Sequence, residues 1–401
     1  MRTFALLAGA ALALVTASGA EAQVSVKLGI LNDMSSLYAD ISGPGSVVAA
    51  RMAVEDFKAA EKGLKVDIVQ ADHQNKPDVG SSIARQWYDQ DGVDVIFDVT
   101  TSSVALAVSE VTREKNKIFM ISGGGTSDLT GAKCTPNNVH WTYDTWALAN
   151  GTGTALTRQG KKTWYFLTAD YAFGAALDRD TSEAVKKAGG QVLGSVKHPL
   201  NSPDFSSYLL QAQGSKAQVI GLANAGADTT NAIKQAGEFG ITQSGQALAG
   251  LLVFASDVKA LGLQAAQGLV LTEAFYWDQN DQTREFSKRF AAKFDGKMPT
   301  SSQAGVYGSV LAYLQTVAAL KSKDSAAVMG KMKSTTFEDP LMGKVTIRQD
   351  GRAIHPMYLF EVKKPAESKS PWDMYKTLAT IPAEEAFRPL ADGGCPLVNK
   401  S

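Results

Sequence analysis

Short apolar runs alternate with amphipathic stretches along the chain. Residues 26–31 alternate between apolar and polar side chains and then become wholly apolar, which is typical of a strand that enters a parallel sheet. Gly43-Pro44-Gly45 interrupts the chain, and residues 46–60 then carry Val48 and Met52 at helical spacing. This part of the sequence therefore predicts a strand followed by a helix.

The same alternation continues through the first two thirds of the chain, with one restart. Further strands are expected over residues 66–70, 93–97 and 118–121, with helices over residues 81–88 and 104–115. After the restart, strands are expected over residues 164–167, 192–196, 219–223 and 248–254, and helices over residues 173–188, 205–213 and 228–239. Strands that alternate with helices form parallel sheets covered on both faces, so the pattern predicts an α/β fold with two Rossmann-like lobes.

The last third of the chain adds elements to both lobes. A strand over residues 270–272, helices over 283–294 and 303–320, a hairpin over 344–352 with an Asp-Gly turn, and a strand over 358–362 are expected there. We interpret this order as a second sheet inserted before the first is complete. The predicted N-terminal lobe comprises residues 23–142 and 274–352. The predicted C-terminal lobe comprises residues 143–273 and 353–401, with its tail tied back to the first lobe.

Residues 1–22 have the pattern of a secretory signal peptide. Arg2 supplies a positive charge, and the apolar stretch over residues 4–15 is too short for a bilayer core of ~30 Å. Ala20-Glu21-Ala22 matches the small-x-small pattern of a cleavage site. A short buried helix and an uncleaved anchor are the alternatives. We predict cleavage before Gln23 and a soluble mature protein in the periplasm.

Composition and charge narrow the class of protein. The chain has 401 residues, of which 44% are hydrophobic, so it is long enough for two ordinary globular domains. Forty Lys and Arg side chains balance forty Asp and Glu side chains, and this balance argues against a dedicated nucleic-acid surface.

Cys134 and Cys395 are the two cysteines, and in an exported chain they predict one disulfide. Two buried free thiols are the alternative.

Enzyme signatures are mostly absent from the sequence. It lacks the phosphate-binding loop, a Gly-x-Gly-x-x-Gly that opens a helix after the first strand, and the Gly-x-Ser-x-Gly elbow of esterases. His73, His140, His198 and His355 are scattered, and neither they nor the two cysteines have the spacing of metal ligands. We therefore expect no catalytic residues, no metal and no cofactor.

Hydroxyl groups and glycines gather where two neighbouring strands are predicted to end. Thr100-Thr101-Ser102-Ser103 follows the third strand, and Gly123-Gly124-Gly125-Thr126-Ser127 follows the fourth. A helix cap is the simpler explanation for one such hydroxyl, but four in a row exceed what a cap requires. Ligands bind at the carboxyl ends of strands in open α/β sheets, where helix N-termini present free N–H groups. The two segments predict a site for a carboxylate-sized anion, bound by neutral donors.

Aromatic residues occupy corresponding positions around the expected cleft. Tyr38 follows the first strand, Tyr171 follows the first strand of the second lobe, and Tyr143 and Phe275 lie where the chain is expected to pass between lobes. Core packing is the alternative for each of them. Their location at strand ends favours a wall of the ligand site.

In order and spacing, these features resemble one known family. The marks are Val26-Lys27-Leu28-Gly29-Ile30-Leu31, the two hydroxyl-rich and glycine-rich segments, Asp170-Tyr171-Ala172-Phe173-Gly174, and Pro299-Thr300-Ser301 before Tyr307. With the leader sequence, the chain resembles the periplasmic solute-binding proteins of ABC importers, in the leucine/isoleucine/valine-binding branch (type I fold). The resemblance covers essentially the whole mature chain. It implies two lobes that are joined by a hinge of three crossings and close around a ligand in the manner of a Venus flytrap.

The resemblance also implies roles for individual residues. The residues that hold a ligand carboxylate in the family correspond to Ser102, Ser103, Gly125 and Thr126, and the aromatic residue of the second lobe corresponds to Tyr171. The cluster that faces the amine of an amino acid falls near Asn224 and Ser256-Asp257, and this sequence has no assured acidic residue there. We therefore predict a small carboxylate ligand that is either a hydrophobic amino acid or an amine-free aromatic acid, such as a benzoate or hydroxycinnamate.

The resemblance implies partners as well. The protein is expected to act as a monomer that delivers its ligand to the membrane subunits of an ABC permease, without binding nucleic acid. A ligand-sensing receptor domain is one alternative, since it shares all the site chemistry. An exported enzyme on the same fold is the other.

Overall fold

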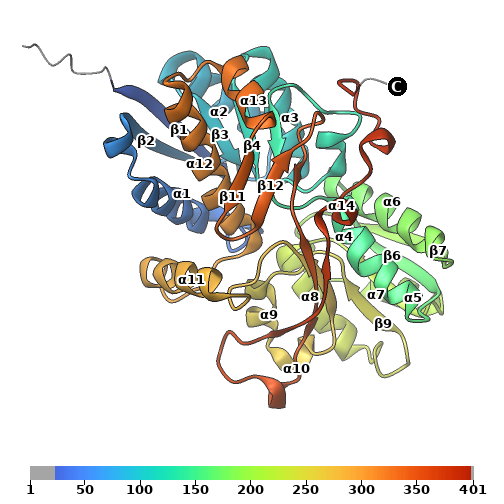
Figure 1. Cartoon of the computed structure of the whole chain (residues 1–401). Helices are drawn as coiled ribbons and strands as arrows, with labels where there is room; N and C mark the ends of the chain where they lie inside the picture. The colour runs from blue at the N-terminus through green and yellow to red at the C-terminus, as the bar shows by residue number, and fades with distance from the viewer. Residues whose placement is uncertain (1–22, 399–401) are drawn as a thin grey trace, which may run out of the picture.

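The chain is described by a computed structural model that covers residues 23–398 (Figure 1). Two α/β lobes lie one above the other, and extended segments run between them. The signal-peptide prediction for residues 1–22 lies outside the described residues. Within the described part, none of the helices has the length and apolar character needed to cross a membrane.

The first lobe is built on a five-stranded sheet with the order β2-β1-β3-β4-β5. All its pairings are parallel, and the strands are β1 (Val24–Asn32), β2 (Leu64–Asp72), β3 (Val95–Asp98), β4 (Ile118–Ile121) and β5 (Asn138–His140). Helices α1 (Gly43–Phe57) and α12 (Ser301–Leu320) pack together over one face, and α2 (Pro77–Gln86) and α3 (Ser102–Glu114) over the other.

The side chains of β3 explain its apolar run. Val95 and Phe97 belong to the core under α1 and α12, where the Phe97 ring meets Tyr313 edge-on with centroids 6.1 Å apart. Ile96 between them belongs to the core under α2 and α3. Alternate side chains point to opposite faces of a strand, and both faces are covered here. The strand therefore has no polar face to show in the sequence.

The second lobe repeats this design with a four-stranded parallel sheet of order β7-β6-β8-β9. Its strands are β6 (Thr163–Ala169), β7 (Gln191–His198), β8 (Val219–Ala223) and β9 (Ala247–Gly250). Its helices include α4 (Thr145–Leu148), α5 (Thr154–Arg158), α6 (Ala172–Lys187), α7 (Ser206–Gly214), α8 (Gly226–Glu238), α9 (Ala255–Leu261) and α10 (Leu263–Ala266). The strand expected over residues 248–254 ends earlier, at Gly250, because the chain leaves the sheet there toward the cleft between the lobes.

Antiparallel strands complete the molecule. β10 (Val270–Glu273), β14 (Met357–Val362) and β15 (Tyr375–Ile381) form one small sheet, and β11 (Thr336–Asp339), β12 (Gly343–Ile347) and β13 (Ala353–Ile354) form another. Between β12 and β13, Arg348 N donates to Arg352 O at 2.9 Å, and Gly351 has a φ of +85°, which confirms the predicted hairpin. Helices α11 (Asp281–Lys293), α13 (Ser325–Lys333) and α14 (Ala383–Ala386) lie in the same third of the chain.

This architecture is the predicted α/β fold with parallel sheets in two lobes. The structure also joins Cys134 to Cys395 in a disulfide, with the Cα atoms 5.6 Å apart. The exact residues at which the chain passes from one lobe to the other, near 142, 273 and 352, stay a prediction from the sequence pattern.

Candidate ligand-binding cleft

A small cavity lies where the carboxyl ends of the two parallel sheets face each other. Its lining comes from the segments that follow β1, β3, β4 and β5 in the first lobe and β6, β8 and β9 in the second. The lining residues are Tyr38, Ile41, Thr100, Thr101, Ser102, Gly123, Gly125, Tyr143, Tyr171, Phe173, Ala225 and Leu252. This is the position at which open α/β sheets bind ligands.

The structure brings most of the predicted site residues to this cavity. Those in the lining are Tyr38, Ser102, Gly125, Tyr143 and Tyr171. The other predicted residues, Ser103, Thr126, Asn224 and Phe275, lie outside it.

One end of the cleft is the N-terminus of α3. The helix begins at Ser102, and the preceding Thr101 makes no side-chain cap, so the first N–H groups of the helix lack a partner within it. Ser102 Oγ accepts a hydrogen bond from Thr126 N at 3.0 Å, which leaves the hydroxyl hydrogen of Ser102 free to be donated. Free amides, a hydroxyl and the positive end of the helix dipole together suit an anionic group.

Gly125 and Thr126 shape this end of the cleft in different ways. A Cβ on Gly125 would stand 2.9 Å from the Phe173 ring and 3.1 Å from the Tyr143 ring, so only glycine lets both rings approach. Thr126 is fully buried, and its Oγ1 accepts from Asp128 N at 3.3 Å, which caps the short helix η3 (Ser127–Thr130). The Thr126 hydroxyl therefore stabilises the helix that follows the glycine turn and does not line the cleft. The side chain of Ser103, one residue into α3, is likewise outside the lining.

Asn224 and Phe275 are held away from the cleft by other partners. Asn224 Nδ2 lies 3.1 Å from His198 Nε2, and its Oδ1 accepts from Thr229 Oγ1 at 2.7 Å, so both ends of its amide are used inside the second lobe. Phe275 is buried, and its ring packs edge-on against Phe286 with centroids 6.3 Å apart. For Phe275 the alternative of core packing, open in the sequence, describes the structure.

The acidic residue considered for an amine partner is also engaged elsewhere. Asp257 Oδ2 accepts from Phe254 N at 2.9 Å at the start of α9. Burial raises the pKa of the Asp257 carboxyl to about 7. Asp257 is not in the cleft lining, so it offers no counter-charge to an ammonium group there.

Hydroxyl pairs close the aromatic wall. Tyr38 OH of the first lobe lies 2.7 Å from Tyr171 OH of the second, so the two side chains meet across the cleft. Tyr143 OH donates to Gly123 O at 2.9 Å. Burial raises the pKa of Tyr38, Tyr143 and Tyr171 well above the usual tyrosine value, and all three stay neutral. The wall is therefore uncharged and rich in hydroxyl groups.

Several lining residues were not singled out from the sequence. Thr100 Oγ1 donates to Asn32 Oδ1 at 3.0 Å, and Thr101 Oγ1 donates to the amide oxygen of Asn75, so amides from neighbouring loops orient both hydroxyls. Their membership of the four-hydroxyl segment was the signal that could have found them. Phe173 and Leu252 gave no such signal, because an apolar residue beside a strand reads equally well as core.

A buried carboxyl, Asp98, lies next to the lining residue Gly123. Asp98, the last residue of β3, accepts hydrogen bonds from Asn32 Nδ2 at 2.8 Å and from the hydroxyls of Ser42 and Ser46. A Cβ on the lining residue Gly123 would stand 2.7 Å from Asp98 Oδ1. Burial raises the pKa of Asp98 to about 6, since its hydrogen-bond donors are neutral. Asp98 and the following Val99 have φ values of +78° and +53°, and a β-branched residue rarely adopts such a backbone.

The fold and this cleft together define a solute-binding protein that closes two lobes on a small molecule. The family model described as "Periplasmic binding protein" matches residues 25–369, and the chain belongs to that family. It is the periplasmic substrate-binding component of an ABC importer, in the leucine/isoleucine/valine-binding branch. The resemblance seen in the sequence is thereby confirmed.

Relatives of known structure cover almost the whole chain. A periplasmic binding protein from Burkholderia mallei is 52% identical, covers 94% of this chain and 99% of its own, and superposes with a TM-score of 0.91. A branched chain amino acid ABC transporter periplasmic ligand-binding protein from Burkholderia xenovorans LB400 is 41% identical over 93% of this chain and 99% of its own, with a TM-score of 0.83. Among curated proteins, Leu/Ile/Val-binding protein homolog 6 of Brucella melitensis is 28% identical over 378 residues, 91% of this chain and 94% of its own.

Proposed function

We propose that this protein captures an amine-free aromatic monocarboxylate, of about the size of a benzoate or hydroxycinnamate, and presents it to the permease. One observation carries the proposal. The cleft offers neutral N–H and O–H donors at the start of α3 and four aromatic rings, and none of the lining residues that the structure describes has a charged side chain. Ser102 and Gly125 are proposed to contact the carboxylate, and Tyr38, Tyr143, Tyr171 and Phe173 the ring.

The carboxylate end is favourable without a cation. Hydrogen bonds to a charged group contribute roughly 1.5–3 kcal/mol each, and the N-terminus of a helix adds a smaller favourable field. Ser102 Oγ and the free N–H groups of the first turn of α3 supply several such donors within one small region. These donors replace the hydrogen bonds that the anion loses when water leaves the cleft.

The opposite end is unfavourable for an α-amino acid. An ammonium group buried without an acidic partner carries a desolvation penalty of several kcal/mol. Asp257 is engaged at the start of α9, and the second-lobe lining consists of Tyr171, Phe173, Ala225 and Leu252. These groups suit an aromatic ring with or without a hydroxyl substituent.

Known relatives point to both ligand classes. The Burkholderia xenovorans relative is described as a branched chain amino acid ABC transporter ligand-binding protein, and this supports a hydrophobic amino acid as second candidate. Rhodopseudomonas palustris solute-binding proteins that are 20–21% identical were solved with benzoate, 4-hydroxybenzoate and 3,4-dihydroxy benzoic acid, with TM-scores of 0.79–0.81. They show that this fold can enclose a benzoate-sized ring. The uncharged cleft favours that class for the present chain.

Closure of the lobes supplies the mechanism. A ligand that touches both lobes only in the closed form shifts the open–closed equilibrium toward that form by its differential affinity. The membrane subunits then recognise the closed form. We further propose that the mature chain is exported after cleavage before Gln23, acts as a monomer without binding nucleic acid, and leaves its ligand chemically unchanged. The lining supplies no acid–base pair for catalysis among its described residues.

A calorimetric panel on ligand-stripped protein tests the ligand class. Benzoate, 4-hydroxybenzoate and 4-hydroxycinnamate are compared with leucine and phenylalanine, and methyl benzoate is the control that lacks the negative charge. We expect binding by at least one acid of the first group and none by methyl benzoate. Binding by the amino acids alone would contradict the proposal and establish the second candidate. If the protein is not an enzyme, the bound acid should be recovered chemically unchanged after hours of incubation with it.

A further inference from the structure

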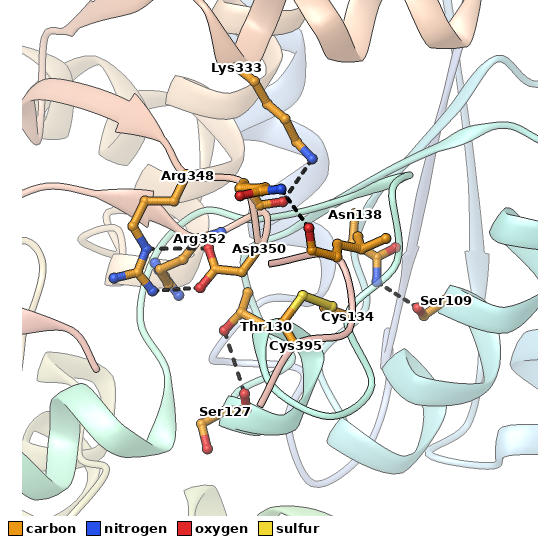
Figure 2. The surroundings of a disulfide bond; sticks show 12 residues. Ser109, Ser127, Thr130, Cys134, Asn138, Lys333, Arg348, Asp350, Arg352 and Cys395 are labelled. Atoms are coloured by element: carbon orange, nitrogen blue, oxygen red, sulfur yellow. Dashed lines mark hydrogen bonds and ion pairs between the residues drawn. A yellow bond between two sulfur atoms is a disulfide. The ribbon is translucent and has the colours of Figure 1, made fainter. Parts of the chain in front are cut away.

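The C-terminal segment returns from the second lobe to the first. Residues 382–398, named here the C-terminal strap, follow β15, whose small sheet packs in the core of the second lobe. In Figure 1 this red segment runs up from the lower lobe and ends beside the upper one. Cys395 is bonded there to Cys134, which lies between η3 and β5 of the first lobe (Figure 2). The strap therefore joins the lobes in addition to the main-chain crossings.

Hydrogen bonds hold the strap at both ends and in the middle. On the second lobe, Asn150 Nδ2 donates to Glu385 O at 2.9 Å. On the turn between β12 and β13, Arg348 Nη1 donates to Arg388 O at 2.7 Å, and Gln349 Nε2 donates to Leu397 O at 2.5 Å. Figure 2 shows Arg348 and Asp350 of this turn near the disulfide. The strap is thus fixed along its length by both lobes.

The strap places one charged side chain between the lobes. Arg388 Nη2 donates to Ser127 Oγ at 2.9 Å and to Asp180 Oδ1 at 3.1 Å. Ser127 follows β4 of the first sheet, whereas Asp180 lies on α6, which follows β6 of the second sheet. Arg388 therefore touches both lobes with the same guanidinium group.

Asp180 is a buried carboxylate that accepts hydrogen bonds at both of its oxygen atoms. Its Oδ2 accepts from Ser127 Oγ at 2.7 Å and from Thr145 Oγ1 at 2.6 Å, and its Oδ1 accepts from Arg179 Nε at 2.9 Å. The Asp180 side chain is fully buried. Moving Ser127 and Arg388 away from α6 would remove the hydrogen bond from Ser127 and the ion pair with Arg388, and would leave Asp180 with Arg179 of its own helix and Thr145. Losing hydrogen bonds to a buried charged group is unfavourable.

From this arrangement we propose that the C-terminal strap is a closure latch. Arg388, held in place by the Cys134–Cys395 disulfide, favours the closed form by completing the partners of Asp180 across the two lobes. The latch lies outside the ligand cleft, since none of its residues lines the cavity between Tyr38 and Tyr171. It sets how readily the lobes open and does not select the ligand. The proposal goes beyond the proposed function and does not depend on the identity of the ligand.

The first test needs no ligand. The radius of gyration of the ligand-free, full mature chain is measured by small-angle scattering for the native protein, Arg388→Ala, and the double variant Cys134→Ser with Cys395→Ser. Lys187→Ala is the matched control, because it removes an exposed cation from the same helix as Asp180 without touching the cluster. We expect a larger radius for Arg388→Ala and for the cysteine variant, and no change for the control.

The second test measures release of whichever ligand the calorimetric panel identifies. If the strap is a latch, the ligand should dissociate at least about fivefold faster from Arg388→Ala, because the weakest usual coupling between sites corresponds to a factor of about five. The order of preference among ligands should not change. A purely structural strap would lower the melting temperature and leave both radius and release rate unaltered, and that result overturns the proposal. An effect of the cysteine variant without any effect of Arg388→Ala overturns it as well. If the cysteine variant does not fold, folded native protein treated with a phosphine reductant takes its place.

Discussion

At the scale of single residues, Ser102 has one contact within the protein and one proposed contact with the ligand. Its hydroxyl oxygen accepts from Thr126 N, which leaves its hydroxyl hydrogen, at the start of α3, free for the proposed carboxylate. Ser103, the next residue, contributes no side chain to the lining. Of these two neighbours, Ser102 is therefore the one proposed to contact the ligand.

Replacing Ser102 by alanine is expected to weaken carboxylate binding strongly. Loss of a hydrogen bond to a charged group is worth roughly 1.5–3 kcal/mol, or about a ten- to hundredfold rise in Kd. Titration calorimetry of Ser102→Ala and of the control Ser103→Ala provides the comparison. Equal affinities for the two variants would show that the Ser102 hydroxyl does not touch the ligand. Thr126→Ala, which removes the cap of η3, is expected to lower the melting temperature as well.

Asp98 predicts a pH dependence of binding. Its buried carboxyl lies next to Gly123, in the part of the lining proposed to hold the ligand carboxylate, and burial raises its pKa to about 6. A second negative charge nearby raises that pKa further, so binding takes up a proton. Affinity for an ionised acid should therefore rise as the pH falls from 8 to 6. Calorimetry at three pH values, in buffers of different ionisation enthalpy, measures both the trend and the proton.

The same carboxyl affects stability with a definite sign. Because the pKa of Asp98 is higher in the folded than in the unfolded chain, the folded state is favoured by protonation, and this contribution is lost as the pH rises through about 6. The rise of the pKa from the usual 3.8 to about 6 corresponds to a loss on the order of 3 kcal/mol. Asp98→Asn, which keeps the size, should remove the pH dependence of binding. An unchanged pH profile in that variant would assign the titration to another group.

At the scale of elements, the start of α8 determines how closely the lobes approach. Gly226, its first residue, has a φ of +58°, and a Cβ there would stand 2.8 Å from Leu37 O of the first lobe. Gly237 lies on the same helix with nothing within 4 Å of its Cβ position. A side chain at Gly226 would therefore collide with the first lobe, whereas a side chain at Gly237 would not.

Gly226→Ala is expected to hinder closure. The new Cβ meets the backbone of the opposite lobe, and the positive φ adds about 1–2 kcal/mol of strain. Ligand affinity should fall at least about tenfold although no cleft residue has changed. Gly237→Ala should leave affinity unchanged and stabilise the chain by about 0.5–1 kcal/mol. Calorimetry and thermal unfolding of both variants test this, and equal ligand affinities would place the Gly226 contact outside the closing motion.

The helices and strands differ in how well they could be predicted from the sequence. β3 and β4 were predictable because both faces of each strand are buried, and residues 95–97 and 118–121 are wholly apolar. β15 was not, because it is an exposed edge strand on which Leu378 is 40% exposed, so its pattern lacks a buried face. The hydroxyl and glycine segments predicted one side of the cleft lining, since strand ends converge at one edge of a parallel sheet. That this side binds a carboxylate stays a proposal. The side-chain directions of Asn224 and Phe275 depend on His198 and Phe286, which are distant in the sequence, and spacing could not supply them.

At the scale of the whole molecule, the disulfide spans most of the chain. The two cysteines are separated by 261 residues, and a cross-link that closes a long loop restricts the unfolded chain more than one that closes a short loop. The bridge therefore stabilises the native fold apart from any effect on opening and closing.

The double variant Cys134→Ser with Cys395→Ser is expected to lose about 2–5 kcal/mol of unfolding free energy. Urea denaturation of the native and variant chains, without reductant, gives the difference. A loss below about 1 kcal/mol would mean that the strap contacts alone hold the tail. The stability effect and the latch effect are separable, because only the latter changes the radius of the folded protein.

The position of this bridge also constrains biosynthesis. Synthesis proceeds from the N-terminus, so Cys134 is made before Cys395, and at 5–20 residues per second the 261 residues of separation take about 13–50 s to synthesise. During that interval Cys134 has no correct partner and, since the chain has two cysteines, no wrong one within itself. Until Cys395 is made, Cys134 can form mixed disulfides only with other molecules, so the length of the intervening chain sets how long this thiol stays open to such reactions.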